Sequence, residues 1–94
     1  MKLKFEWDAA KAEANWKKHG VSFALAQEVF RDPFAVLRVD ERAEYGEERF
    51  VIIGAAENKV LLAVAYTERE ANIRLISARR ATQHEQDDYL LENR

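Results

Sequence analysis

Two apolar runs separated by three residues constrain the fold of this chain more than any other feature of its sequence. Residues 49–56 contain Phe50-Val-Ile-Ile53, and residues 60–67 contain Leu61-Leu-Ala-Val-Ala-Tyr66. β-Branched and aromatic residues favour strands, and a connection as short as Glu57-Asn-Lys59 favours antiparallel pairing of the strands that it joins. The sequence therefore predicts a β-hairpin at the centre of the fold.

Two further segments are predicted to extend this hairpin into a four-stranded antiparallel meander. Residues 35–39 have the pattern of a short strand, and a charged loop over residues 40–48 follows them. Residues 68–71 turn the chain again, and residues 72–78 supply the last strand. Each strand pairs in this prediction with the one before it.

Side-chain alternation divides the last predicted strand between two faces of the sheet, because successive side chains of a strand point in opposite directions. One face is expected to hold Ile73, Leu75 and Ser77, and the other Arg74 and Ile76.

Helix signals fill the N-terminal third of the chain. Asp8 is a suitable N-cap for a helix over residues 9–19, and Gly20 is suited to end it in the left-handed conformation. Ser22 is a suitable N-cap for a second helix over residues 23–31. The two helices with their tight connection predict an αα-hairpin.

A third helix is predicted at the C-terminus. Asp32-Pro33 ends the second helix, because the residue before proline avoids the helical region. Thr82-Gln-His-Glu85 matches a capping box, and the helix that it starts should end near Leu91. The order of elements predicts an α+β fold, with the helices packed against one face of an antiparallel sheet.

Composition excludes several classes of protein. The chain of 94 residues makes one domain, residues 1–94, and its net charge of −2 argues against a general nucleic-acid binder. It has no cysteine, no apolar run near the roughly 20 residues of a membrane span, and no apolar signal region after Met1, so we expect a cytoplasmic protein. His19 and His84 lie far apart and without carboxylates at ligand spacing, so we expect neither a metal nor a cofactor.

Positive charge is concentrated in one region of this acidic chain. Residues 58–82 carry a net charge of +3, from five cations and two carboxylates, and four arginines lie within twelve residues of this segment: Arg69, Arg74, Arg79 and Arg80. Guanidinium groups offer planar pairs of donors that match phosphate oxygens. We therefore expect a phosphate site in which Arg69 and Arg79 lie at strand ends beside Glu68.

Cleavage of RNA without a metal requires a base for the 2′-hydroxyl proton, cations for the transition state and an acid for the leaving oxygen. Glu68, the arginines, and Lys18 or His19 could supply these groups. His19 has an alternative role, since a protonated histidine at a helix C-terminus interacts favourably with the helix dipole. His84 is expected at the surface. Trp7 and Trp16 could stack on bases, but Trp16, at helical spacing from Ala12, is expected in the core.

A set of short motifs in a fixed order is shared with one family. These motifs are Phe5-Glu-Trp-Asp8, Lys11, Asn15, Lys18-His-Gly-Val-Ser-Phe23, Asp32-Pro33, Gly46-Glu-Glu-Arg49, Ile53-Gly54, Thr67-Glu-Arg69, Ile73-Arg-Leu-Ile-Ser-Ala-Arg79, Ala81-Thr82, Glu85 and Tyr89. Together they resemble the BrnT-type ribonuclease toxins of bacterial type II toxin–antitoxin systems, over almost the whole chain.

The resemblance implies a RelE-like fold and metal-independent RNA cleavage that stops growth. It also implies neutralisation by a BrnA-like antitoxin, whose ribbon-helix-helix dimer would form a hetero-oligomer with the toxin and repress the operon's own promoter. Operator DNA would be contacted only through the antitoxin. By motif, the catalytic positions would be Lys18, His19, Glu68, Arg69 and Arg79. The positions that contact RNA phosphates would be Arg49, Arg74 and Arg80.

Two other functions are compatible with the sequence. The acidic balance and the polar C-terminal helix are also expected of a catalytically inactive interaction module that acts as a co-repressor subunit. A sheet that binds RNA without cleaving it is the third possibility. Growth arrest on expression without the antitoxin would separate a toxin from an inactive module.

Overall fold

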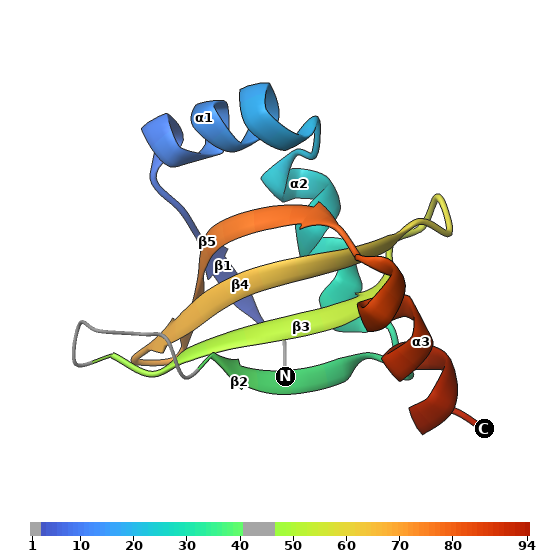
Figure 1. Cartoon of the computed structure of the whole chain (residues 1–94). Coiled ribbons are helices and arrows are strands. Elements are labelled where there is room, and N and C mark those ends of the chain that lie inside the picture. The colour runs from blue at the N-terminus through green and yellow to red at the C-terminus, as the bar shows by residue number, and fades with distance from the viewer. Residues whose placement is uncertain (1–2, 41–46) are drawn as a thin grey trace.

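Five strands form one mixed sheet in the computed structural model of the chain, which describes residues 3–40 and 47–94 (Figure 1). The elements in chain order are β1 (Lys4–Glu6), α1 (Ala9–His19), α2 (Phe23–Ala26), the 3₁₀ helix η1 (Gln27–Arg31), β2 (Val36–Asp40), β3 (Arg49–Ala55), β4 (Leu61–Arg69), β5 (Asn72–Arg80) and α3 (Gln83–Glu92). The strand order is β1-β5-β4-β3-β2. Most of the acidic loop predicted over residues 40–48 lies outside the described residues.

The predicted meander is confirmed, but the sheet has one more strand. From β2 to β5, each strand pairs antiparallel with the next strand along the chain. In the central hairpin of β3 and β4, the paired residues run from Arg49 and Thr67 to Ala55 and Leu61. The prediction of four antiparallel strands missed β1, which pairs parallel with β5 and places Phe5 opposite Ile73. A strand of three residues is too short to show alternation, and it forms because the edge of β5 offers it hydrogen-bond partners.

Helix ends follow the predicted capping signals. The Asp8 carboxylate accepts a hydrogen bond from the backbone N–H of Ala10, and Gly20 ends α1 with a φ of 67°. The Ser22 hydroxyl caps α2, which continues directly into η1. At the start of α3, Thr82 and Glu85 form the predicted capping box. Each of these ends is thus fixed by residues within a few positions of it.

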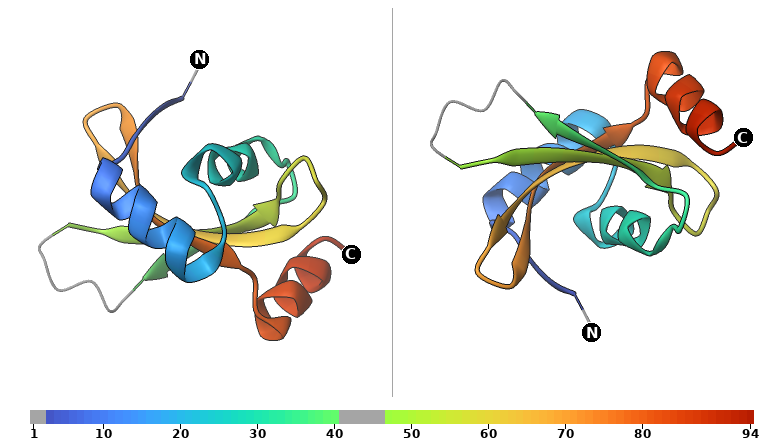
Figure 2. Two further views of the ribbon diagram at one scale, coloured as in Figure 1. Left: turned by 90° about the horizontal axis from the view of Figure 1, so that it is seen from above. Right: turned by 90° about the horizontal axis from the view of Figure 1, so that it is seen from below.

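Helices cover both faces of the sheet, so the prediction that they pack on one face is wrong. α2 and η1 bury Phe23, Ala26 and Val29 against one face of β3, β4 and β5. α3 lies on the opposite face, where Tyr89 packs against Ile53 (Figure 2). No helix in the described parts of the chain is long and apolar enough to cross a membrane.

α1 lies beside the edge of the sheet, and this placement overturns the prediction that Trp16 is a core residue. Trp16 is 58% exposed. The buried residue of α1 is Asn15, which faces β5. Spacing along a helix identifies residues that share a face, but it does not identify which face meets the sheet.

A β-bulge in β5 changes the predicted alternation. Ala65 pairs with Ser77, whereas the next residue, Tyr66, pairs with Leu75, so Ile76 is an extra residue in β5. A bulge of this kind shifts the phase of all later side chains on its strand. Ser77 therefore projects from the same face as Arg74, and the prediction that these two residues point to opposite faces is wrong.

Asp32 joins η1, β3 and α3. Its carboxylate accepts hydrogen bonds from the Ala55 N–H at 2.8 Å, the Phe34 N–H at 2.9 Å and the Tyr89 hydroxyl at 2.8 Å. Burial alone raises the pKa of Asp32, but these hydrogen bonds outweigh it and the net pKa is lowered. Gly54 permits the close approach, because a Cβ there would lie 2.9 Å from a side-chain carbon of Val29.

Asp32→Asn should lower Tm at pH 7 by roughly 5–10 °C, since hydrogen bonds to a charged group are lost. A carboxyl group whose folded pKa is depressed stabilises the fold above its unfolded pKa, and this contribution is lost as the pH falls through the folded pKa. The difference from wild type should therefore shrink as the pH is lowered from 5 to 3, when Tm is followed by circular dichroism. Asp87→Asn, at an exposed position of α3, is the control. A difference that stays constant with pH would contradict this assignment.

Candidate functional site

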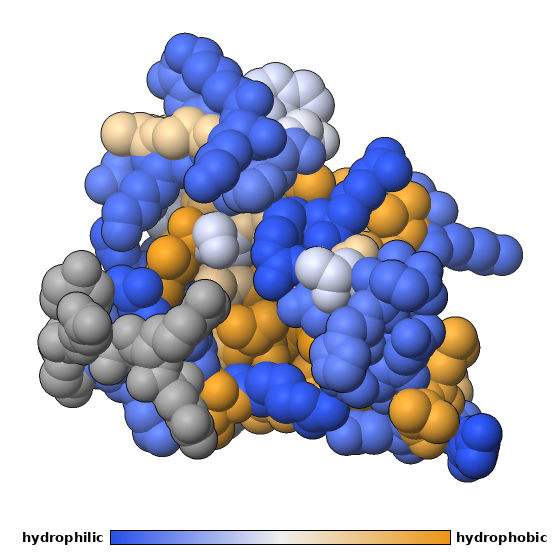
Figure 3. Space-filling view, viewed as in Figure 1, coloured by the Kyte–Doolittle hydropathy of each residue, from blue (hydrophilic) through white to orange (hydrophobic). Residues whose placement is uncertain are grey.

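The sheet face opposite α2 and η1, which we call the open face, contains a hollow of about 210 Å³. Its wall includes Arg49 of β3 and Arg79 of β5, and the small side chains of Ala63 and Ala65 belong to its floor. Figure 3 shows this face, where hydrophobic surface lies between hydrophilic side chains. Small residues on β4 leave room for a ligand between the two arginines.

A second hollow, of about 270 Å³, lies between α1 and β5. Lys11, Lys18 and His19 of α1 line it. Both hollows share Ile76 and Ser77, the two residues at the bulge, and therefore adjoin there. The bulge thus connects the cations of α1 with those of the sheet.

Asn15 fixes α1 in this position. Its side-chain amide donates to the carbonyl oxygens of Ala78, at 2.8 Å, and Val21, at 2.9 Å, and its oxygen accepts from the Ala78 N–H at 2.9 Å. The amide thereby occupies the free edge of β5 as a neighbouring strand would. In the sequence, Asn15 is recognisable only as part of a motif; a polar residue among the inward-facing positions of α1 is the signal that could have identified it.

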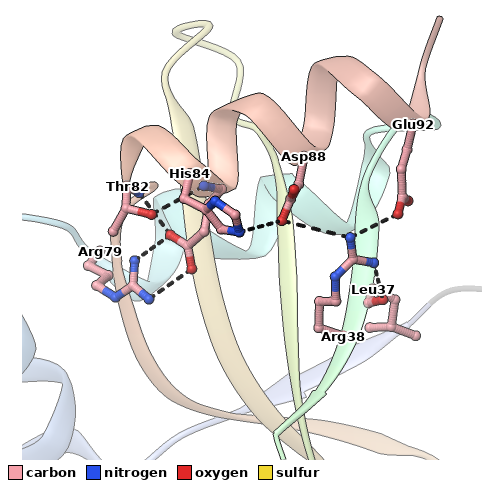
Figure 4. Close-up of polar contacts among 8 residues, drawn as sticks. Leu37, Arg38, Arg79, Thr82, His84, Asp88 and Glu92 are labelled. Carbon is pink, nitrogen blue, oxygen red and sulfur yellow. Dashed lines mark hydrogen bonds and ion pairs between the residues drawn. The ribbon is translucent and has the colours of Figure 1, made fainter.

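Arg79 is held in place by Glu85 at the start of α3 (Figure 4). The two ends of the guanidinium donate to the two carboxylate oxygens, Nη1 to Oε1 at 2.7 Å and Nη2 to Oε2 at 3.0 Å. This bonding raises the pKa of Arg79 and lowers that of Glu85, although burial opposes both changes. Glu85 and the Arg80 carbonyl together accept three of the five N–H groups of the guanidinium. The remaining donors and a half-exposed side chain allow Arg79 to bind a phosphate while its orientation is fixed.

A second arginine attaches the far end of α3 to the sheet. Arg38 of β2 lies 2.8 Å from a carboxylate oxygen of Glu92 and 3.9 Å from one of Asp88 (Figure 4). His84 is exposed, as predicted, and lies 3.6 Å from Asp88. α3 is therefore attached to the open face largely through ion pairs and hydrogen bonds, and none of its residues is buried.

The expected grouping of Arg69 and Arg79 beside Glu68 is not found. Arg79 pairs with Ala63, whereas Arg69 lies six residues further along β4, roughly 20 Å away at the strand spacing. Arg69 instead forms an ion pair with Glu47 at 3.0 Å. A hairpin brings together residues that are symmetric about its turn, and these two arginines are not.

Glu68 and Arg80 project from the covered face of the sheet, the face against which α2 and η1 pack. Glu68 pairs with the core residue Ile73, and Arg80 pairs with the core residue Leu62. Both side chains are exposed because they lie beyond the area that α2 and η1 cover. Of the predicted site residues, the two hollows bring together Lys18, His19, Arg49 and Arg79; Arg74 shares the open face, bound to Glu6 at 3.3 Å.

Residues 7–85 match the model of a protein family described as the ribonuclease toxin, BrnT, of type II toxin–antitoxin systems. The fold is similar to the crystal structure of the Brucella abortus ribonuclease toxin BrnT, with a TM-score of 0.65 and 28% sequence identity. That match covers 87% of this chain and 100% of the Brucella chain. No curated protein sequence matches this chain significantly.

Proposed function

Because the chain belongs to the BrnT family of ribonuclease toxins of type II toxin–antitoxin systems, we propose that its open face binds RNA and cleaves it without a metal ion. The observation that supports this site is the pair of adjoining hollows, which gathers Lys18, His19, Arg49 and Arg79 around the bulge at Ser77. Cations on three different elements converge there on a surface large enough for a nucleotide. The protein would act in the cytoplasm, where RNA is present.

In the proposed reaction, the 2′-oxygen of a ribose attacks the adjacent phosphorus while the bond to the 5′-oxygen breaks. His19 takes the 2′-hydroxyl proton, because imidazole is the side chain best suited to exchange protons near neutral pH. Arg79 stabilises the charge on the phosphate oxygens, and Lys18 supplies a proton to the leaving oxygen. The products are a 2′,3′-cyclic phosphate and a 5′-hydroxyl end.

The choice of His19 over Glu68 as the base can be tested with two variants. Purified wild-type protein is expected to cleave single-stranded RNA in excess EDTA and to leave cyclic phosphate ends. His19→Gln should lower the rate by roughly 100-fold, the usual contribution of a positioned base, whereas Glu68→Gln should change it less than about threefold.

Each outcome of this experiment has a definite meaning. RNA that stays intact with wild-type protein in EDTA, but is cleaved when Mg²⁺ is added, would contradict metal independence. RNA that stays intact under both conditions would contradict the ribonuclease assignment. A large loss in Glu68→Gln with full activity in His19→Gln would place the reaction on the other face of the sheet.

We further propose that a BrnA-like antitoxin with a ribbon-helix-helix dimer neutralises this toxin and that their complex represses the operon. Expression of the chain alone should arrest growth, and co-expression of the antitoxin should restore it.

The bidentate bond between Arg79 and Glu85 favours a second candidate, a co-repressor subunit without catalysis, because it partly occupies the catalytic arginine. Normal growth on expression alone, with intact promoter binding by the complex, would support that alternative.

A further inference from the structure

One transverse row of the sheet carries a polar side chain from every strand. Cross-strand pairing joins Asp40 to Arg49, Arg49 to Thr67, Thr67 to Arg74, and Arg74 to Glu6. Paired residues on neighbouring strands project from the same face, so all five belong to the open face. Across the sheet their charges run negative, positive, neutral, positive and negative. The central residue is thus flanked by two arginines.

Thr67 at the centre of this row has a buried hydroxyl without a hydrogen-bond partner. The residue is 2% exposed, and its Oγ1 is the one buried side-chain oxygen or nitrogen in the described part of the chain for which no partner is found. Burying a hydroxyl without a partner is unfavourable, and valine would fill the same volume without this cost. The hydroxyl therefore lacks a structural role in the free protein.

The two arginines can converge over this hydroxyl. They lie on the strands either side of β4, so their Cα atoms are roughly 10 Å apart, within reach of two guanidinium groups that bind one anion. Arg74 keeps its ion pair with Glu6 and is partly exposed, and Arg49 also has a polar contact within the chain. Glu6 lies on the outer side of Arg74 in the row, so the Arg74 guanidinium is held towards the sheet edge in the free protein, and an anion above Thr67 would draw both long arginine side chains towards the centre of the row.

We propose that Arg49, Thr67 and Arg74 form a second phosphate subsite, which binds a backbone phosphate of the RNA other than the one that is cleaved. Thr67 lies four residues along β4 from Ala63, the partner of Arg79, or roughly 13 Å at the strand spacing. This distance separates Thr67 from Arg79 by more than one phosphate, and Arg49, which pairs with Thr67 and also lines the hollow of the cleavage site, borders both. The subsite rests on the proposed function, since it orients a strand of RNA along β4 across the open face.

The test compares binding of two RNA probes by fluorescence anisotropy. The first is a hexanucleotide with 2′-O-methyl groups, which cannot be cleaved and spans both sites; the second is a dinucleotide with one phosphate. Thr67→Val should weaken hexanucleotide binding by roughly tenfold, the effect of losing one hydrogen bond to a charged group, and leave dinucleotide binding unchanged. Thr67→Ser should retain wild-type affinity. Tm should not fall in Thr67→Val, because the hydroxyl has no partner to lose.

Arg74→Gln provides an independent measurement. Removing one phosphate contact should reduce the slope of log affinity against log salt by about 0.7 for the hexanucleotide. Arg31→Gln, an exposed arginine of η1 on the covered face, is the matched control and should leave the slope unchanged.

Unchanged hexanucleotide affinity in Thr67→Val, or a fall in its Tm, would overturn the subsite. Failure of the proposed function is distinguishable, because wild-type protein would then bind the hexanucleotide but leave ordinary RNA intact. A wild-type protein that does not bind the hexanucleotide would overturn the subsite directly.

Discussion

Replacing Arg79 by alanine is expected to lower the rate of RNA cleavage by roughly 1,000-fold, with little change in the affinity for uncleaved RNA. Arg79 lines the hollow on the open face, and Glu85 holds both ends of its guanidinium. A donor that is already oriented stabilises the charge that develops on the phosphate without the cost of ordering it during the reaction. Its loss should therefore act on the rate of the chemical step, measured under single-turnover conditions.

Arg80→Ala is the matched control, because it removes the same group one residue along β5 but in a row that belongs to the other face. We expect its rate to remain within about threefold of wild type. Arg79→Lys should recover only part of the loss, since lysine cannot make the bidentate contact with Glu85 and phosphate. Equal rate losses in Arg79→Ala and Arg80→Ala would show that charge near the end of β5, and not the oriented guanidinium, is what matters.

Replacing Asn15 by alanine is expected to lower the free energy of unfolding by about 3 kcal/mol and Tm by roughly 15–25 °C. The change leaves the buried N–H and carbonyl of Ala78 without partners at the free edge of β5, and each unsatisfied group costs roughly 1–3 kcal/mol. The gain in helix propensity, about 0.5 kcal/mol, is too small to compensate. Urea denaturation followed by circular dichroism measures the effect.

Asn93→Ala is the control for this prediction. Asn93 also donates two hydrogen bonds to backbone carbonyls, but at an exposed position after α3, so its loss should cost less than about 1 kcal/mol. Because Asn15 also sets the distance between α1 and β5, the folded fraction of Asn15→Ala should cleave RNA more slowly than wild type. Equal stabilities of the two variants would contradict the assignment of Asn15 as the residue that anchors α1.

The elements of the fold were largely predictable because their signals are local. Asp8, Ser22 and Thr82 were identified as caps, and the central hairpin was identified from two apolar runs and the turn between them. β1 was missed because three residues carry no periodic pattern, and it is stable only where the edge of β5 receives it. The burial of Trp16 was predicted wrongly because its helix lies beside the sheet and not over it.

The candidate site was predicted by residue type better than by position. Lys18, His19, Arg49 and Arg79 meet in the two hollows, but the structure separates Arg69 and Glu68 from them. The assignment of catalytic roles stays a prediction. Ser77 and Asn15 were not chosen from the sequence, because their importance depends on contacts with residues far away in the chain.

The sequence by itself determined the order of helices and strands, most of their ends, and the concentration of arginine between residues 58 and 82. These properties depend on interactions among residues a few positions apart, so short stretches of sequence are sufficient to specify them. The tertiary structure alone decided which arginines share a face. One extra residue at Ile76 shifts the phase of β5, and that shift is what aligns Ser77 and Arg79 with Arg74. The position of a bulge depends on how the side chains of both sheet faces pack, and a short stretch of sequence does not reveal this packing.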